Sequence, residues 1–291
     1  MTSEHGLLPV IKGESQDGSA RDVLTINAPL VTAWLEEFLR HEIRFRRGFS
    51  RAVVGVSGGV DSALVAYLCA RALGPDNVIG IRMPYKTSSP QSLEHARLVT
   101  SALGIDEHTF DITDMVDGYL ALDPTADGRR RGNVMARSRM IVLFDQSERF
   151  RALPIGTGNK SERLLGYFTW HADDSPPINP IGDIFKTQVW QLARYVGVPS
   201  AIVDKPASAD LIVGQTDEAD FGLPYAAADR ILHYLISGYP VDWIRRHGFS
   251  DEEIMLVKKR LDGTHWKRNL PTIAMLSGTS INDYYLRPVD Y

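Results

Sequence analysis

Hydrophobic residues recur along this chain at two spacings, and stretches of one kind alternate with stretches of the other. Short apolar runs typical of buried strands are followed by longer segments whose apolar positions lie three or four residues apart, as in amphipathic helices. The predicted strands cover residues 51–56, 78–82, 107–110 and 152–156, with a short fifth strand at 201–203. The predicted helices cover residues 29–45, 92–103, 131–150 and 186–196, and a further helix begins after residue 62. This alternation predicts an α/β fold, in which an open parallel sheet carries helices on both faces.

The pattern changes in the last third of the chain. Residues 206–224 are expected to form a long loop with several acidic residues, and loops of this length are usually functional. Three helices are predicted over residues 225–237, 240–247 and 251–261. Residues 1–27 mix polar with scattered apolar positions and are expected to form an arm. The pattern therefore predicts one α/β domain with a C-terminal helical extension.

Composition and charge restrict the class of protein without changing this fold. The chain has 291 residues, of which 44% are hydrophobic and 23% charged, as is ordinary for a globular protein. The formal net charge of -4 would not draw it to nucleic acid or to an anionic membrane, so neither partner is expected. The N-terminus lacks the apolar stretch of a signal peptide, and no apolar run reaches the roughly 20 residues that span a bilayer. A cytoplasmic enzyme is predicted.

The chain has a single cysteine, Cys69, which excludes an internal disulfide and a cysteine-based metal cluster. Cys69 shares the apolar face of its predicted helix with Leu64, Leu68 and Ala72. It is therefore predicted to be a small core residue and not a nucleophile.

A polar loop at residues 57–62 reads Ser-Gly-Gly-Val-Asp-Ser and joins the first predicted strand to a helix. Ligands of open parallel sheets bind beyond the carboxyl ends of the strands, where this loop is expected. Two adjacent glycines let successive backbone N–H groups point toward one anion, and the helix N-terminus adds to the attraction. Asp61 would repel a bare phosphate, but it suits Mg²⁺, which bridges carboxylate and phosphate oxygens.

This loop lacks the lysine and the longer spacing of a Walker A sequence. It resembles the Ser-Gly-Gly-x-Asp-Ser signature of the ATP pyrophosphatase superfamily, whose members cleave ATP between the α- and β-phosphates. The resemblance implies that ATP is a co-substrate bound by Gly55, Val56, Ser57, Gly58, Gly59, Val60, Asp61 and Ser62. The alternative is a tight strand-to-helix turn in which Asp61 is only the N-cap.

A second segment, residues 156–169, reads Gly-Thr-Gly-Asn-Lys-Ser-Glu-Arg-Leu-Leu-Gly-Tyr-Phe-Thr. It resembles the second nucleotide loop of the ammonia-dependent NAD synthetases. Since it follows the fourth predicted strand, it can face the first loop. The resemblance implies that Thr157 contacts ATP and that Glu162 binds Mg²⁺ together with Asp61. The alternative is that Glu162 is a first-turn helix residue favoured by the helix dipole.

Further segments resemble the same family. Residues 131–139 resemble the segment that holds deamido-NAD, with Arg137 at the substrate-binding position. Lys186 begins a predicted helix, where positive charge is unfavourable, and resembles a lysine that contacts ATP. Ser208 takes the place of a hydroxyl that contacts ATP, and residues 214–218 resemble a loop that covers the substrate. The resemblance also implies an ATP contact from Arg82 and deamido-NAD contacts from Trp170, Asp173, Lys267 and Arg268.

Three positions depart from the pattern that is common in the family. Trp170 stands where many relatives have a substrate-binding lysine, Pro177 where they have an aspartate, and Trp266 where they have a histidine before the basic pair. The nearby Asp173 and Asp174 are candidates for the acidic role. These departures concern the nicotinate pocket and leave the ATP chemistry intact.

The resemblance covers residues 28–275, a single domain in the family, and leaves residues 276–291 as a tail. It implies ATP-dependent amidation of deamido-NAD by ammonia, through an adenylated carboxylate, in a homodimer. Asp61, Lys186 and Asp173 are the predicted catalytic residues, with Asp173 accepting a proton from ammonium. Glutamine-hydrolysing domains need a cysteine nucleophile, and Cys69 is predicted to be core. Free ammonia is therefore the expected nitrogen source, unless a separate glutaminase subunit supplies it.

Two other functions remain open at this point. Another ATP-pyrophosphatase ligase, such as a GMP synthetase ATPase subunit, would share the first loop but not the segments at 131–139 and 156–169. A catalytically silent nucleotide-binding module would share the fold but would not need Asp61, Glu162 and Lys186. RNA thiolation enzymes typically carry sulfur on paired cysteines, which this chain lacks.

Overall fold

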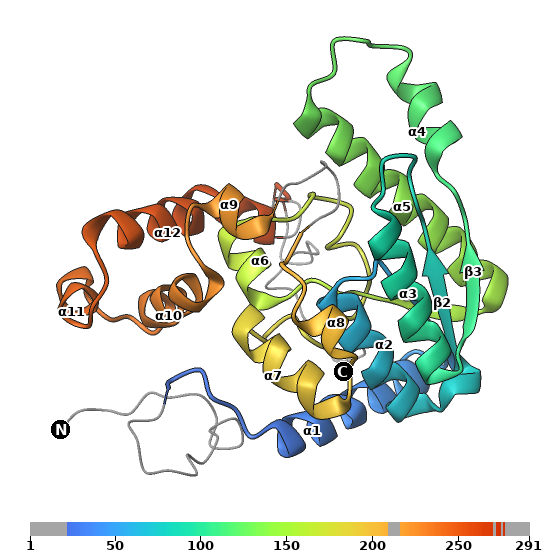
Figure 1. Ribbon diagram of the computed structural model, residues 1–291, viewed down its shortest axis with the longest axis horizontal. Coiled ribbons are helices and arrows are strands. Elements are labelled where there is room, and N and C mark those ends of the chain that lie inside the picture. Colours follow the sequence, from blue (N-terminus) through green and yellow to red (C-terminus); the bar gives the residue numbers. More distant parts are fainter. Residues whose placement is uncertain (1–21, 209–215, 270–271, 275, 277–291) are drawn as a thin grey trace.

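The computed structural model describes residues 22–208, 216–269, 272–274 and 276 (Figure 1). Its centre is a parallel sheet of β1 (Arg51–Gly55), β2 (Val78–Arg82), β3 (Asp106–Thr109) and β4 (Ala152–Ile155), in the order β3-β2-β1-β4. The predicted open parallel sheet is thus confirmed. The chain leaves β1 toward β2 on one side and returns to β4 on the other, so the topological switch point lies between β1 and β4.

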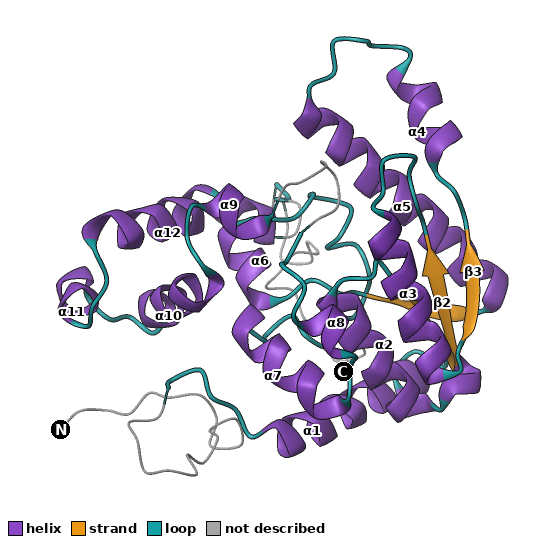
Figure 2. Cartoon of the chain, viewed as in Figure 1, coloured by secondary structure: helices purple, strands orange, loops and turns teal. Residues whose placement is uncertain are grey.

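Helices cover both faces of the sheet (Figure 2), because successive side chains of a strand point to opposite faces. Ala52 and Val54 of β1 pack in a core shared with α2 (Val60–Leu73), whereas Val53 packs in a separate core with α5 (Gly128–Phe150). All three side chains are fully buried. Burial on both faces explains why this strand is a continuous apolar run.

The remaining helices of the α/β unit divide between the two faces. The core beside α2 also includes residues of α1 (Ala28–Arg40), α3 (Pro90–Leu103), α7 (Lys186–Val196) and α8 (Ser200–Val203), and the core beside α5 includes α4 (Thr113–Leu120). A π-helical turn, His41–Phe45, extends α1. The helix predicted at residues 29–45 is confirmed, and its apolar face packs in the core through Val31, Leu35 and Leu39.

The C-terminal helices form a third core together with α6 (Lys160–Leu165). They are α9 (Asp217–Phe221), α10 (Tyr225–Ile236), α11 (Val241–Arg246) and α12 (Asp251–Gly263), followed by a 3₁₀ turn at His265–Arg268. Figure 1 shows α10, α11 and α12 on the far side of α6 and α7 from the sheet. The predicted C-terminal helical extension is confirmed.

The fifth strand predicted at 201–203 is wrong. These residues belong to the short helix α8, which begins after Pro199 and buries Ile202 and Val203. Three apolar residues in a row are too few to distinguish the period of a strand from that of a helix. Beyond β4, the sheet is extended only by an isolated bridge between Ile155 and Ile178 among the described residues.

Three short helices were not among the predicted elements. The segment at residues 156–169 turns into α6 at Lys160, so Glu162 does lie in a first helical turn, α9 lies inside the long predicted loop, and α4 had not been predicted. These helices have five, six or eight residues, too few to establish an apolar period.

Part of the predicted N-terminal arm is docked on the α/β unit. Leu24 and Ile26 are buried, and the Leu24 carbonyl accepts hydrogen bonds from the side chains of Gln188 and Gln191 on α7. The rest of the predicted arm, residues 1–21, lies outside the described residues, as does the predicted tail apart from residue 276.

Candidate active site

A cavity of about 280 Å³ lies at the carboxyl ends of β1 and β4, at the switch point of the sheet. Its lining includes these predicted ATP-binding residues: Gly55, Val56, Ser57, Gly59, Val60, Asp61, Ser62, Arg82, Thr157, Lys186 and Ser208. Glu162 and Asp173 also line it. The remaining predicted site residues, Gly58, Arg137, Trp170, Lys267 and Arg268, are not part of the lining.

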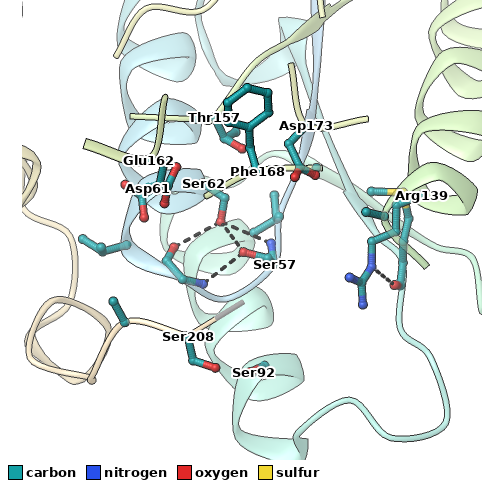
Figure 3. Close-up of a pocket in the computed structure, with 18 of the residues that line it drawn as sticks. Ser57, Asp61, Ser62, Ser92, Arg139, Thr157, Glu162, Phe168, Asp173 and Ser208 are labelled. Atoms are coloured by element: carbon teal, nitrogen blue, oxygen red, sulfur yellow. Dashed lines mark hydrogen bonds between the residues drawn. The ribbon is translucent and has the colours of Figure 1, made fainter. Parts of the chain in front are cut away.

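The first loop is held in shape by its two serines (Figure 3). Ser62 Oγ lies 3.0 Å from Ser57 Oγ, accepts a hydrogen bond from the Ser57 N–H and donates to the Gly59 carbonyl. Gly59 is the N-cap of α2, so the loop passes directly into the helix. A fixed loop at a helix N-terminus is suited to a phosphate group.

Gly58 is the position in this loop that requires glycine. Its φ of +83° is in the left-handed region, and a Cβ built there would lie 2.1 Å from the carbonyl oxygen of Ser92 on α3. The first turns of α3 therefore support the back of the loop, although Gly58 does not itself line the cavity.

Asp61 joins three segments that are distant in sequence. The Asp61 side chain makes no capping hydrogen bond at the start of α2, so the view of Asp61 as only an N-cap is wrong. Its Oδ1 accepts a hydrogen bond from Asn159 Nδ2 at 2.8 Å, and its Oδ2 contacts the ammonium of Lys186. Both oxygens of this carboxylate are therefore engaged by the protein.

Glu162 combines a structural contact with a position in the cavity. Its Oε2 accepts a hydrogen bond from the Asn159 N–H, and Asn159 Oδ1 accepts one from the Glu162 N–H, which forms a capping box at the start of α6. Its Oε1 lies 3.9 Å from Lys186 Nζ. Burial raises the pKa of Glu162 well above its ordinary value, and the charge of Asp61 adds to the effect. A cation at this point would stabilise both carboxylates.

Lys186 is a buried cation at the first position of α7, where the helix dipole disfavours positive charge. Burial alone would lower the pKa of Lys186, but the charges of Asp61, Glu162 and Asp217 raise it above its ordinary value. The ammonium is therefore maintained by the surrounding carboxylates.

Asp217 is a cavity residue that the sequence did not single out. It is buried, and its Oδ2 accepts a hydrogen bond from the Tyr225 hydroxyl at 3.1 Å. The ring of Tyr225 lies 5.5 Å from Lys186 Nζ. The signals in the sequence were an acidic residue within a long loop and its place in residues 214–218, which resemble a loop that covers the substrate.

A buried aspartate on α10 holds the start of α7 in place. Asp229 accepts hydrogen bonds from Ser161 Oγ on α6 and from both the N–H and the hydroxyl of Thr187 on α7. Ser161 Oγ in turn accepts a hydrogen bond from the Lys186 N–H at 2.9 Å. Burial raises the pKa of Asp229 to about 6.

Besides Lys186, the basic residues Arg82, Arg139, Arg163 and Lys205 line the cavity. Arg82 forms an ion pair with Glu107 at 2.5 Å, and Arg139 donates a hydrogen bond to the Met83 carbonyl at 3.2 Å. Lys205 donates to Ser92 Oγ at 2.9 Å. The sequence had not singled out Arg139 or Lys205, because their orientation depends on tertiary contacts.

The predicted substrate arginine lies in a second groove, beside the first cavity. Arg137 donates a hydrogen bond to the Trp170 carbonyl at 3.0 Å, and its neighbour Asn133 accepts one from Thr169. The groove is lined by residues of α4, α5 and the turn between them: Tyr119, Leu120, Leu122, Asp123, Ala126, Arg130, Asn133, Val134 and Arg137. The segment containing Thr169 and Trp170 thus connects the two hollows.

The predicted basic pair binds backbone carbonyls. Lys267 Nζ donates to the carbonyls of Gly166 and Phe168, and Arg268 donates to those of Leu164 and Leu261. These contacts join the end of α6 to the end of α12. The pair lies next to the cavity, because Phe168 is part of its lining.

Two of the positions that depart from the family pattern contact each other. The rings of Trp170 and Trp266 meet edge to face, with centroids 5.3 Å apart, and Trp170 also packs on His171. Trp266 is 56% exposed. An aromatic pair therefore lies at the segment that connects the cavity and the groove.

Cys69 is fully buried in the core beside α2, and burial raises the pKa of its thiol to about 12. The prediction of a core cysteine is confirmed. Within the described ranges, no cluster of three or more His, Cys, Asp or Glu side chains is arranged to hold a metal ion.

Comparison with known proteins decides between the functions left open by the sequence. The model of the family described as NAD synthase matches residues 31–271. The chain belongs to the NAD synthase family. It is 47% identical to the NH(3)-dependent NAD(+) synthetase of Trichlorobacter lovleyi over 260 residues, which cover 89% of this chain and 95% of the relative. It is 45% identical to the enzyme of the same name from Fusobacterium nucleatum, over 87% of this chain and 98% of the relative.

Solved structures of this family have the same fold. The NH3-dependent NAD synthetase of Campylobacter jejuni superposes with a TM-score of 0.74 at 29% identity, over 86% of this chain and all of that chain (100%). An NMN synthetase from Francisella tularensis superposes with a TM-score of 0.76 at 27% identity, over 86% of this chain and 99% of that chain. These matches favour an NAD synthetase over a GMP synthetase subunit.

In the part of the chain that the structure describes, no helix is both long enough and apolar enough to cross a bilayer.

Proposed function

We propose that this chain catalyses the ATP-dependent amidation of deamido-NAD by ammonia, giving NAD, AMP and pyrophosphate. The observation that carries the proposal is the meeting of Asp61, Glu162 and Lys186 beside a phosphate-type loop at the switch point of the sheet. This constellation occurs in a chain that is 47% identical to an NH(3)-dependent NAD(+) synthetase.

In this proposal the first cavity binds ATP. The loop at residues 57–62 and the N-terminus of α2 receive the polyphosphate through backbone N–H groups and serine hydroxyls. Arg82, Thr157 and Ser208 lie on other parts of the same lining and add polar contacts to the nucleotide.

We assign Asp61 and Glu162 as the protein ligands of Mg²⁺. The donor set fits this ion, because both side chains offer carboxylate oxygens and the Lys186 ammonium lies within 4 Å of both. Mg²⁺ is usually held by one or two carboxylates together with substrate phosphates, which suits a site with only two such ligands. When bound, it would neutralise charge on the phosphates during the reaction.

The chain's own residues then assist two steps. The nicotinate carboxylate of deamido-NAD attacks the α-phosphorus of ATP, and Lys186 stabilises the negative charge that develops on the departing pyrophosphate. Ammonia next attacks the adenylate and displaces AMP. Neither step requires a side-chain nucleophile, so the site works mainly by positioning the reactants.

Asp173 is the candidate that accepts a proton from ammonium. It lines the cavity, and its Oδ2 accepts a hydrogen bond from the Thr169 N–H at 2.9 Å, which fixes the carboxylate. An Asp173→Asn variant that turns over ammonium at the rate of the unmodified enzyme would remove this residue from the mechanism.

We assign deamido-NAD to the region between the cavity and the groove. Arg137 and Lys267 both donate to backbone carbonyls of the segment at residues 168–170, and Asp173 follows it in the chain. Trp170 and Arg268 flank the same region. Binding there would place the nicotinate end of the dinucleotide next to ATP.

Ammonia is the proposed nitrogen source for this chain. Hydrolysis of glutamine to release ammonia uses a cysteine nucleophile with a lowered thiol pKa. Cys69 has the opposite properties, because it is fully buried and burial raises its pKa to about 12. Glutamine should therefore fail to replace ammonium in assays with the purified chain.

We also propose that the protein forms a homodimer through the α4–α5 face. Ile141 and Phe144 are exposed and follow Arg137 on α5 at helical spacing. Tyr119 of α4, which lines the groove together with Arg137, is 61% exposed. A partner copy on this face would adjoin the proposed substrate region. Light scattering should give a dimer that Ile141→Glu with Phe144→Glu converts to a monomer, whereas Trp34→Glu on α1 leaves it dimeric.

A substrate panel tests the proposed reaction. The purified chain is incubated with ATP, Mg²⁺ and ammonium, together with deamido-NAD, the carboxylate precursor of NMN or xanthosine monophosphate. Amide formation from deamido-NAD at the highest kcat/KM supports the proposal. Preference for the NMN precursor would keep the reaction and change the substrate, and preference for xanthosine monophosphate would replace the proposal by a GMP synthetase.

A further inference from the structure

One buried carboxylate of the cavity has no part in the mechanism given above. Asp217 is 4% exposed, and its Oδ2 accepts a hydrogen bond from the Tyr225 hydroxyl. Its Oδ1 is also buried and has no hydrogen-bond partner within 3.5 Å in the described part of the chain, although the Tyr167 hydroxyl interacts with the carboxylate. Because an unpaired buried oxygen destabilises a fold, such atoms call for a specific explanation.

The proposed metal ligands are already paired with a cation in this structure. Asp61 is engaged by Asn159 on one oxygen and by the Lys186 ammonium on the other. A divalent cation shared by Asp61 and Glu162 would approach the position that the ammonium now occupies. Since two cations repel strongly at short range in a buried site, Lys186 has to leave Asp61 when the metal binds.

Asp217 is the remaining carboxylate to which Lys186 could turn. Tyr225 contacts both residues, with its ring 5.5 Å from Lys186 Nζ and its hydroxyl hydrogen-bonded to Asp217. The negative charge of Asp217 already acts on Lys186. The charges that act most strongly on Lys186 are those of Asp61, Glu162 and Asp217, and the first two belong to the proposed metal ligands. Asp229 also interacts with Lys186, but its two oxygens already accept hydrogen bonds from Ser161 and Thr187.

We propose that Asp217 is a positioning residue that receives the Lys186 ammonium when a divalent cation and ATP occupy the Asp61–Glu162 pair. The inference rests on the proposed metal site. In the empty site Lys186 neutralises Asp61, and in the loaded site it lies between Asp217 and the phosphates. The alternative is that Asp217 has only a structural role: it begins α9, and its N–H donates a hydrogen bond to the Ala207 carbonyl. In that case its substitution would lower stability, and the effect would not depend on whether Lys186 is present.

A double-mutant cycle separates the two roles. Binding of Mn²⁺ in the presence of α,β-methylene-ATP is followed by electron paramagnetic resonance in the unmodified protein, Asp217→Asn, Lys186→Met and the double variant. We expect Asp217→Asn to raise the Mn²⁺ midpoint about tenfold when Lys186 is present and less than about twofold in the Lys186→Met background. Without the ammonium, there is nothing for Asp217 to receive.

Two further variants act as controls. Asp220→Asn removes the same charge from the same short helix and should shift the midpoint equally in both backgrounds, if at all. Asp217→Glu keeps the carboxylate and should stay within about twofold of the unmodified midpoint, since no opposite charge is lost. It also provides a test if the asparagine variant folds poorly, because a large shift with glutamate would contradict the proposal.

Other outcomes are equally decisive. If Asp217→Asn shifts the Mn²⁺ midpoint equally with and without Lys186, the charge of Asp217 acts on the metal directly and the inference is wrong. An unchanged Mn²⁺ midpoint in Asp217→Asn would also overturn it. If Asp61→Ala binds Mn²⁺ as tightly as the unmodified protein, the proposed metal site fails and this inference fails with it.

Discussion

Ser161 and Asp229 are hydrogen-bonded in the interior at 2.5 Å, although 68 residues separate them in sequence. The same Ser161 oxygen accepts the N–H of Lys186, so the contact links α10 to the first residue of α7. The position of the proposed ATP-contacting lysine therefore depends on a carboxylate in the C-terminal extension. These hydrogen bonds join the extension to the α/β unit at the site.

Asp229 should make stability depend on pH. Its carboxyl has a pKa of about 6 in the folded protein, against 3.8 for an unburied group, so the folded state retains the proton to higher pH. The stability from this group is fully present below pH 3.8 and is lost as the pH rises through about 6. The loss is on the order of 3 kcal/mol.

Urea unfolding of the unmodified protein and Asp229→Asn at several pH values between 3 and 7 checks this prediction. The difference in unfolding free energy between the two should change by about 3 kcal/mol across the window, with the unmodified protein losing stability as the pH rises. If the unfolding free energies of the two proteins change in parallel with pH, the folded state does not raise the pKa of Asp229 as predicted.

Gly58→Ala should disable the first loop. The alanine has to adopt a φ of +83° and place its Cβ 2.1 Å from a backbone oxygen of Ser92. Conformational strain alone costs about 1–2 kcal/mol, and the contact with α3 adds to it. We expect a lower Tm and loss of ATP binding measured by calorimetry.

Gly48→Ala is the control for Gly58→Ala, because Gly48 has a φ of +69° but a Cβ there would meet nothing within 4 Å. It should cost only the conformational strain and leave ATP binding unchanged. Equal effects of the two substitutions would show that the contact with Ser92 is unimportant.

Trp170→Ala and Trp266→Ala should weaken the binding of deamido-NAD. Each substitution removes one ring of an edge-to-face pair beside the proposed substrate region. We expect the KM for deamido-NAD to rise about tenfold, with the KM for ATP unchanged. Because the rings touch, the double variant should lose less than the product of the two single effects.

Steady-state kinetics with each substrate varied in turn measures these effects. Trp34→Ala, at a tryptophan exposed on α1, should leave both KM values unchanged. If only the KM for ATP rises, the aromatic pair contacts ATP and not deamido-NAD, and the prediction is wrong.

The strands that are buried on both faces could be predicted from the sequence alone. β1, β2 and β4 are continuous apolar runs, and the loops that follow β1 and β4 meet because parallel strands end at one edge of a sheet. The pairing of Asp61 with a region 98 to 125 residues away was therefore expected in outline.

Other features depend on tertiary contacts that no local pattern contains. Asp217 becomes part of the cavity only because Tyr225 and Lys186 pack around it, and α8 was mistaken for a strand because three apolar residues have no readable period. Similarly, the Lys267 ammonium binds backbone carbonyls, whose positions the sequence does not give.

The most direct test of the proposed reaction compares the unmodified protein with Asp61→Ala. Each is mixed with ATP, Mg²⁺, deamido-NAD and ammonium, and NAD and AMP are quantified together. We expect equal amounts of NAD and AMP from the unmodified protein and a loss on the order of 10²–10³-fold in kcat for Asp61→Ala, because a principal electrostatic group is removed. AMP without NAD, or NAD formation at full rate by Asp61→Ala, would contradict this account.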